Sequence, residues 1–322
     1  MNKLRDNLSP VALPDGWSGY LVSRALVSSE SWVCILSTLC TSPDSLPGVQ
    51  RLKCDPDSEV LRVDIALDDR HRDIVCKHHR ASGSIARVVA RFRPSRARRN
   101  AERALALMDM GIDTAAPLAI LERKSPRPES WLITEFVPDL LGLDRIALRE
   151  LPHLTRRDAR RLKNGLVETI AALLQKLHLA GLTHRDFKAS NILMGHTANE
   201  DPRDSDGISR EGRDVCRTAN EIRHAAKGLS YTAWLLDLDG LQSVSRPKLA
   251  ARLRPIIRLT ASLSDSPWVT RGDLARLIRL TIRDADLPND DWRNAYRFVS
   301  HQAFHYSQAS RQRKKNKLDG YV

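Results

Sequence analysis

The fold of this chain is decided by the stretch His184-Arg185-Asp186-Phe187-Lys188-Ala189-Ser190-Asn191. It fits the spacing H-R-D-x-x-x-x-N, in which the aspartate can face an attacking hydroxyl while the asparagine side chain reaches a metal ion. A long amphipathic segment, residues 155–181, precedes the stretch, and the apolar Ile192-Leu193 follows it. This context argues against a chance capping or turn sequence.

A second acidic position ends an apolar run at Leu235-Leu236-Asp237. A carboxylate at the end of a buried strand is costly unless it meets a cation. Asp237 is therefore predicted to bind Mg²⁺, as Asn191 is, and the alternative is a turn-capping role. Asp239 stands where a D-F-G motif has glycine, which leaves open whether it assists or is a solvated turn acid.

A lysine and a glutamate upstream complete a possible nucleotide site. Lys77 ends a predicted strand, and no other lysine lies between residues 53 and 124. Glu102 lies on the following predicted helix and could pair with Lys77, although neighbouring arginines offer surface partners instead. Residues 134–137 would form a hinge whose main chain holds adenine. The predicted ATP-binding residues are Lys77, Glu102, Glu135 and Val137.

Phosphoryl transfer from ATP needs a cation on the phosphates, an acid that fixes it, metal ligands, and a carboxylate beside the attacking hydroxyl. The order of these candidates along the chain matches that requirement. Lys188 could offset charge on the γ-phosphate in the transition state. The predicted catalytic residues are Asp186, Lys188, Arg185 and His184. No G-x-G-x-x-G precedes Lys77, so the way in which the phosphates are covered stays open.

The predicted elements give an α+β fold with two lobes. Residues 51–137 read as an N-lobe, an antiparallel sheet with one helix, in the order strand, strand, helix, strand, strand over residues 58–137. Residues 138–308 read as a mainly helical C-lobe with a flexible insertion at residues 197–230. Residues 1–50 read as an irregular extension that ends in a short helix near residues 30–40, and residues 309–322 as a basic tail.

Composition points to a cytoplasmic protein with an anionic partner. The five cysteines form no CxxC pair, and the longest early apolar run is too short to span a bilayer. The net charge of +13 is concentrated in residues 87–103 and 311–317. Such clusters attract nucleic acid, an anionic membrane or a phosphorylated sugar, unless they are only solvated helix faces.

With these motifs in place, residues 51–306 resemble the lipopolysaccharide kinase family of the Kdo/WaaP type, relatives of protein kinases with the same two-lobed fold. The resemblance rests on residues 74–77, 98–112, 132–137, 184–193, 236–239 and 271–277. It implies an ATP- and Mg²⁺-dependent kinase acting on a Kdo or heptose hydroxyl of the lipopolysaccharide inner core. The implied acceptor is this core or a lipid-linked sugar, at the inner face of the inner membrane. An anionic membrane surface is an expected partner, and nucleic acid is not.

Two alternatives remain. Lys188 is typical of serine/threonine protein kinases, but no A-P-E segment follows Gly240, and the helix predicted at residues 271–277 leaves no room for a full peptide-docking lobe. An inactive kinase fold that binds a partner is disfavoured by the joint presence of Lys77, Asp186, Asn191 and Asp237. Catalysis with Mg²⁺ and ATP alone would separate this alternative from the two kinases.

Overall fold

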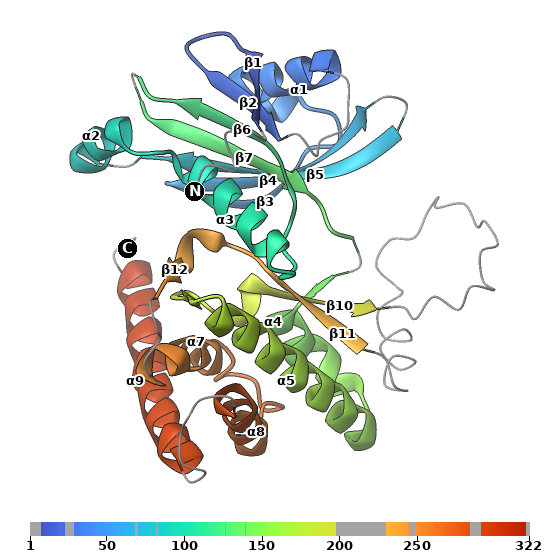
Figure 1. Cartoon of the computed structure of the whole chain (residues 1–322), viewed down its shortest axis with the longest axis vertical. Helices are drawn as coiled ribbons and strands as arrows, with labels where there is room; N and C mark the ends of the chain where they lie inside the picture. The colour runs from blue at the N-terminus through green and yellow to red at the C-terminus, as the bar shows by residue number, and fades with distance from the viewer. Residues whose placement is uncertain are drawn as a thin grey trace, which may run out of the picture. The chain divides into compact units, whose positions relative to one another are not determined.

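The computed structural model describes residues 8–22, 29–67, 70–81, 83–125, 127–138, 140–197, 230–244, 249–283 and 291–319. The chain divides into two compact units. Unit 1 runs to Pro138 and includes the short segment Asp237–Asp239. Unit 2 comprises Asp139–Leu236 and Gly240–Val322. Figure 1 colours both units by residue number.

Unit 1 is built on a seven-stranded sheet in the order β1-β2-β6-β7-β5-β4-β3, and all its neighbouring strands are antiparallel. The strands are β1 (Leu8–Ala12), β2 (Ser18–Val22), β3 (Gln50–Asp55), β4 (Ser58–Leu67), β5 (Arg70–Arg80), β6 (Pro117–Arg123) and β7 (Glu129–Glu135). β4 and β5 form a hairpin in which Val60 lies opposite Lys77. The four strands predicted over residues 58–137 are β4, β5, β6 and β7.

The helices of unit 1 are α1 (Ser29–Thr41), α2 (Ser84–Phe92) and α3 (Arg96–Asp109). The predicted helix is α3. The Ser95 hydroxyl caps its start by accepting a hydrogen bond from the Arg98 N–H, and Gly111, at φ +66°, follows its end. The sequence analysis missed α2, because its apolar Val88, Val89 and Phe92 are exposed and form no buried stripe.

The prediction of an irregular extension over residues 1–50 is wrong for the described part. β1 and β2 join the sheet beside β6, and α1 buries Trp32, Leu36 and Leu39 in its core. The helix expected near residues 30–40 is α1. The strands gave no clear pattern because each has only five residues and because β1, an edge strand containing Pro10, is largely exposed.

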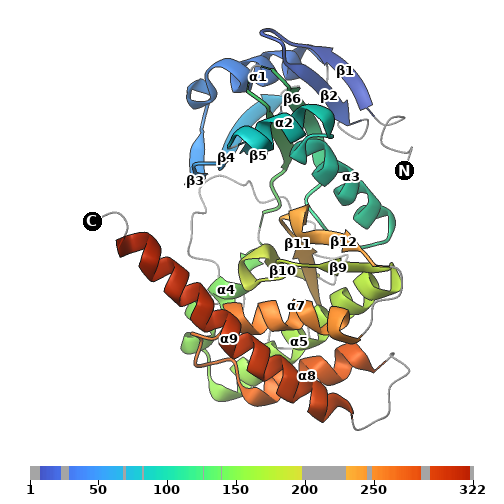
Figure 2. The same ribbon diagram turned by 90° about the vertical axis from the view of Figure 1, so that its left-hand side faces the viewer.

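Unit 2 is mainly helical. Its helices are α4 (Leu143–Arg145), α5 (Arg156–Leu179), α7 (Leu249–Ser262), α8 (Arg271–Ile282) and α9 (Asp291–Asp319). Thr155 caps α5, the helix that corresponds to the amphipathic segment predicted at residues 155–181. Figure 2 shows α9 lying across α7 and α8, and α8 in turn packs against α5. Along the described residues, no helix has both the length and the apolar character that crossing a bilayer requires.

Short strands and turns hold the loops of unit 2. β10 (Ile192–Thr197) pairs with β8 (Leu141–Gly142) and β11 (Ser230–Leu235), while β9 (Leu182–His184) pairs with β12 (Leu241–Ser243). The described residues also form the short 3₁₀-helices η2 (Pro43–Ser45), η4 (Leu151–His153), η5 (Ala189–Asn191) and η6 (Leu238–Gly240), and the π-helix η3 (Ile146–Glu150).

Two predicted segments differ from the structure or lie outside it. The insertion predicted at residues 197–230 lies outside the described residues, except for its two end residues, which close β10 and open β11. The prediction that a separate basic tail begins at residue 309 is wrong, because α9 continues to Asp319. Arg311 on this helix forms an ion pair with Asp265.

The burial of α1 gives a stability prediction. Leu36 is 0% exposed, so Leu36→Ala should lower the free energy of unfolding by about 2–5 kcal/mol. Urea unfolding measures the change. Cys34→Ala, an exposed position on the same helix, is the matched control and should have little effect. Equal stabilities of the two variants would show that α1 is not part of the core of unit 1.

Candidate active site

Lys77 and Asp237 form an ion pair within unit 1. Lys77 lies on β5, which has strands on both sides, and its Nζ donates to Asp237 Oδ1 at 2.7 Å. The two side chains are 24% and 35% exposed. Asp237 has φ +52°, a left-handed backbone that costs a non-glycine residue on the order of 1 kcal/mol. Such conformations cluster at functional sites, and here the fold holds a carboxylate against a lysine.

Asp239 has a defined partner. Arg96, the first residue of α3, donates from Nε and Nη2 to Asp239 Oδ2 at 3.0 Å and 2.5 Å. Arg103 donates to the Leu238 carbonyl oxygen at 3.0 Å. Burial raises the pKa of Asp239, but Arg96 and Lys77 outweigh this effect and lower the pKa below its usual value. Asp239 therefore anchors the segment Asp237–Asp239 to α3 and is not a solvated turn acid.

The predicted pair between Lys77 and Glu102 is not formed. Lys77 contacts Asp237, and Glu102 is exposed. Glu102 is next to the buried Ala101 on α3, so it projects about 100° away from the side that faces the sheet. Arg96 and Arg103, which are both on α3, instead bind the segment Asp237–Asp239. In the sequence, Arg96 and Arg103 belong to a cluster of basic residues. Their partners, Asp239 and the Leu238 carbonyl oxygen, lie more than 100 positions away and could not be inferred from it.

The predicted hinge follows β7. The Glu135 side chain is exposed, and its N–H donates to the Ala116 carbonyl oxygen at 3.0 Å. Phe136 N–H donates to the Asp73 carbonyl oxygen at 3.1 Å. Val137 is half-buried and makes no backbone–backbone hydrogen bond within the described ranges. Of the two predicted adenine-binding residues, Glu135 and Val137, only Val137 therefore has backbone N–H and carbonyl groups that could hydrogen-bond to a ligand.

Two cations hold Asp186 in unit 2. Its Oδ2 lies 2.9 Å from Lys188 Nζ, and its Oδ1 lies 2.8 Å from Arg258 Nη2. Burial raises the pKa of Asp186, but Lys188 and then Arg258 outweigh burial and lower the pKa below its usual value. Arg258, on α7, also stacks over Tyr306 at 4.1 Å. The sequence analysis missed Arg258, which lies 72 positions beyond Asp186 and belongs to no motif.

His184 and Arg185 support the loop. The His184 ring is fully buried, with its centroid 6.2 Å from that of Phe187. A Cβ at Gly240 would come within 2.7 Å of His184 Cε1, so only glycine fits there without a shift. Arg185 N–H donates to the Gly240 carbonyl oxygen at 2.9 Å, while the Arg185 side chain is exposed. Both predicted residues thus contribute to the position of Asp186.

The predicted metal ligands offer hard oxygen atoms. Asn191 Nδ2 donates to the Asp186 carbonyl oxygen at 2.9 Å, so its amide oxygen is the atom left for a cation. Asp237 offers a partly exposed carboxylate. Mg²⁺ binds few protein oxygens and keeps several waters, so these donors fit it. The described residues contain no group of three or more His, Cys, Asp or Glu that could hold a metal.

The fold is that of the kinases. The solved structure of WaaP in complex with acyl carrier protein matches with a TM-score of 0.51 and 21% sequence identity, over 81% of this chain and 90% of that chain. This likeness confirms the predicted protein-kinase-like fold. The crystal structure of the BubR1 kinase domain is a weaker match, with a TM-score of 0.38 and 12% identity over 90% of this chain and 75% of that one.

Residues 61–205 match the model of the lipopolysaccharide kinase (Kdo/WaaP) family. The matched residues contain Lys77, Asp186 and Asn191, whereas Asp237 lies beyond them. The predicted resemblance is therefore confirmed, and so is the predicted class of enzyme, a kinase that transfers phosphate to a sugar hydroxyl. No curated protein sequence matches the chain.

The cations around Asp186 give a pH-dependent prediction. A carboxylate with a lowered pKa adds stability above its unfolded pKa of about 3.9 and loses it as the pH falls through that value and then through its own lower one. Arg258→Met should therefore lower the free energy of unfolding at neutral pH, and the deficit should shrink in acid. Urea unfolding over this pH range measures it.

The control for this prediction is Arg254→Met, an exposed arginine on the same helix, which should differ little from the wild type at every pH. An Arg258→Met deficit of the same size at all pH values would contradict the assignment. It would mean that Arg258 acts through its stacking on Tyr306 and not through the charge of Asp186.

Proposed function

We propose that this chain is an ATP- and Mg²⁺-dependent kinase that phosphorylates a Kdo or heptose hydroxyl of the lipopolysaccharide inner core. The observation that carries the proposal is the ionised Asp186, which lies within the residues that match the family and is held by Lys188 and by Arg258 of α7. We further propose that the enzyme works in the cytoplasm at the inner membrane, where its net charge of +13 favours an anionic surface.

Unit 1 supplies residues for the nucleotide. Val137 would hold adenine through its main chain, and Lys77 would bind the phosphates. Asp237, which now pairs with Lys77 at 2.7 Å, would then act as a metal ligand, as Asn191 would. Mg²⁺ bound by these oxygens would neutralise phosphate charge. The Lys77–Asp237 ion pair orients both side chains until Lys77 binds the phosphates and Asp237 binds the metal.

Unit 2 supplies the group that acts on the acceptor. The acceptor hydroxyl oxygen attacks the γ-phosphorus, the bond from this phosphorus to the bridging oxygen of ADP breaks, and the hydroxyl proton passes to Asp186. The lowered pKa makes Asp186 a weak base. Its main contribution is therefore to orient the hydroxyl, and the proton transfers late. Lys188, which is 2.9 Å from Asp186, can move to the transferred phosphoryl group and offset its charge.

The first test is a screen for the acceptor. Labelled ATP and Mg²⁺ are supplied with dephosphorylated lipopolysaccharide core, free Kdo, free heptose or a generic protein substrate. The proposal expects label on the core and none on the protein. Asp186→Asn should lower turnover on the order of 10²–10⁴-fold with ATP affinity unchanged, because the carboxylate acts on the hydroxyl.

Asp265→Asn, which changes an exposed carboxylate of unit 2, is the control for this screen and should keep full turnover. Label on the protein substrate alone would reject the sugar acceptor in favour of a protein kinase. Loss of ATP binding by Asp186→Asn, with turnover of the bound fraction intact, would reject the proposed role of this carboxylate.

A second prediction concerns the metal. Asn191→Ala removes an oxygen ligand and Asp237→Asn removes the negative charge of one, so each should raise the Mg²⁺ concentration needed for half-maximal turnover. A Mg²⁺ titration of initial rates measures the shift. Asp113→Asn, at an exposed position after α3, should leave the curve unchanged. Superimposable curves for the wild type and both ligand variants would show that neither residue binds the metal.

A further inference from the structure

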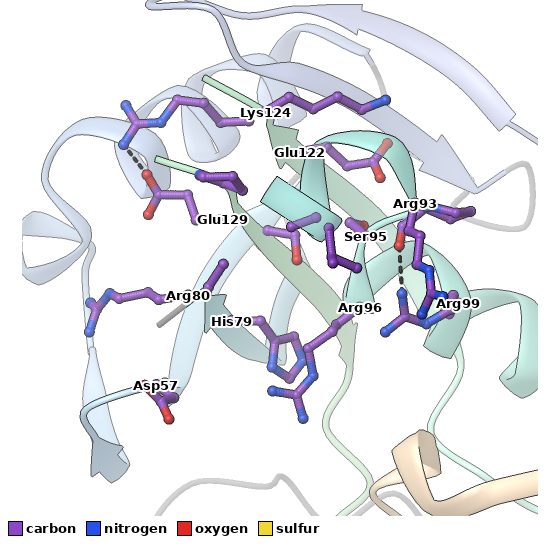
Figure 3. Close-up of a pocket in the computed structure, with 17 residues that line it drawn as sticks. Asp57, His79, Arg80, Arg93, Ser95, Arg96, Arg99, Glu122, Lys124 and Glu129 are labelled. Atoms are coloured by element: carbon purple, nitrogen blue, oxygen red, sulfur yellow. Dashed lines mark hydrogen bonds and ion pairs between the residues drawn. The ribbon is translucent and has the colours of Figure 1, made fainter. Parts of the chain in front are cut away.

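Unit 1 contains a cavity of about 420 Å³ that the proposed reaction does not use. Its lining comes from the end of β5, α2, the start of α3 and the hairpin between β6 and β7 (Figure 3). Neither Lys77 nor Val137 nor Asp237 lines it. Its volume falls within the range of small-molecule sites, about 300–1,000 Å³. The cavity is therefore a second possible site.

The lining is strongly basic, and part of its charge is not neutralised. Arg93 and Lys124 form no ion pair with any residue that the structure describes, and Arg99 donates only to the neutral Pro94 carbonyl oxygen, at 2.6 Å. Two of the carboxylates in the lining are already paired: Glu122 accepts from Arg98, and Glu129 from His78 and Arg123. The remaining charge favours an anion.

A buried histidine also points to a ligand. His79 lines the cavity and is 2% exposed, and neither of its ring nitrogens has a hydrogen-bond partner. Burial, with Lys77 and Arg96 nearby, lowers the pKa of His79 to about 3, so the ring is neutral and carries one unused N–H donor. A buried donor of this kind is normally satisfied, and an anion in the cavity would accept from it.

The start of α3 adds a third attraction. Pro94, Ser95 and Arg96 line the cavity, so the positive end of a 14-residue helix borders it. The first turn of α3 contains no acidic residue of its own, and the one carboxylate that hydrogen-bonds its N-cap Ser95 is Glu122 of β6, which Arg98 also binds. Backbone N–H groups at such an end commonly bind phosphate.

From these observations we propose that the cavity binds a phosphate monoester, as a second ligand distinct from ATP. Arg93, Arg99 and Lys124 supply the charge, and His79 supplies a hydrogen bond from the buried wall. A phosphorylated sugar in solution and the phosphate headgroup of a lipid share this chemistry.

Arg96 links the cavity to the segment Asp237–Asp239. Its side chain lines the cavity, beside His79 in Figure 3, and holds Asp239 at 2.5 Å. A phosphate in the cavity therefore competes with Asp239 for one guanidinium group. Binding of the monoester weakens the anchor of the segment that contains Asp237, which makes the cavity a regulatory site.

The test measures binding of inorganic phosphate to the full chain by calorimetry, without ATP or Mg²⁺. Arg99→Gln and Arg93→Gln should each weaken binding on the order of tenfold, because each removes a charged donor. Arg87→Gln, an exposed arginine of α2 outside the cavity, makes the same charge change and should have no effect. Asp239→Asn should tighten binding several-fold, because it removes the competitor for Arg96.

Two further arms separate the possible explanations. Lys77→Met should still bind phosphate, because Lys77 does not line the cavity; loss of binding would place the ion at the nucleotide site and overturn the proposal. Equal weakening by Arg87→Gln and Arg99→Gln, or no binding by the wild type, would also overturn it. Since the assay contains no ATP and no sugar acceptor, its outcome is independent of the proposed kinase reaction.

The source of the phosphate is tested by competition against bound inorganic phosphate. Glucose 6-phosphate represents a soluble monoester, and vesicles of phosphatidylcholine with phosphatidic acid represent a lipid one. Displacement by the sugar phosphate alone assigns a soluble ligand, and displacement by the vesicles alone assigns a lipid. Failure of both, with pure phosphatidylcholine vesicles as the blank, would overturn the assignment to a monoester.

Discussion

The attraction between the short segment Asp237–Asp239 and three cations of unit 1 is the constraint on which this unit depends. Lys77 holds Asp237 at 2.7 Å, and Arg96 holds Asp239 at 2.5 Å. Arg103 holds the Leu238 carbonyl oxygen between them. These contacts stabilise the left-handed backbone of Asp237, since a partly buried carboxylate without a cation would be costly. The sheet and α3 thus fix a short piece of chain that is distant in sequence.

In unit 2, a partly buried carboxylate, that of Asp186, is also held by cations. Lys188 comes from the same loop, whereas Arg258 reaches the carboxylate from α7. The two cations keep Asp186 ionised but also make it a poor proton acceptor. This suits phosphoryl transfer, in which positioning and electrostatics contribute more than strong basicity. The buried His184 and the close approach of Gly240 then keep the loop backbone in place.

The parts that could be predicted are those whose signal is local in sequence. Spacing within residues 184–191 and the strands flanking Lys77 indicated the fold and the family. The pairing of Glu102 with Lys77 could not be judged from the sequence, because the exposure of Glu102 depends on how α3 packs against the sheet. Arg258 and the partners of Asp239 could not be predicted, since their contacts join residues 72 or more positions apart. β1 and β2 were missed because each has only five residues and because β1 is largely exposed.

The assignment of Asp237–Asp239 to unit 1 has a consequence for how the chain can be divided. The flanking residues Leu236 and Gly240 belong to unit 2, so the polypeptide enters and leaves unit 1 a second time, long after Pro138. A recombinant fragment that stops at Pro138 would keep Lys77, Arg96 and Arg103 but lose the acidic segment that they bind. Unit 1 is therefore complete only in a chain that extends at least to Asp239. Expressed alone, residues 1–138 would leave these three cations without the acidic segment that neutralises them.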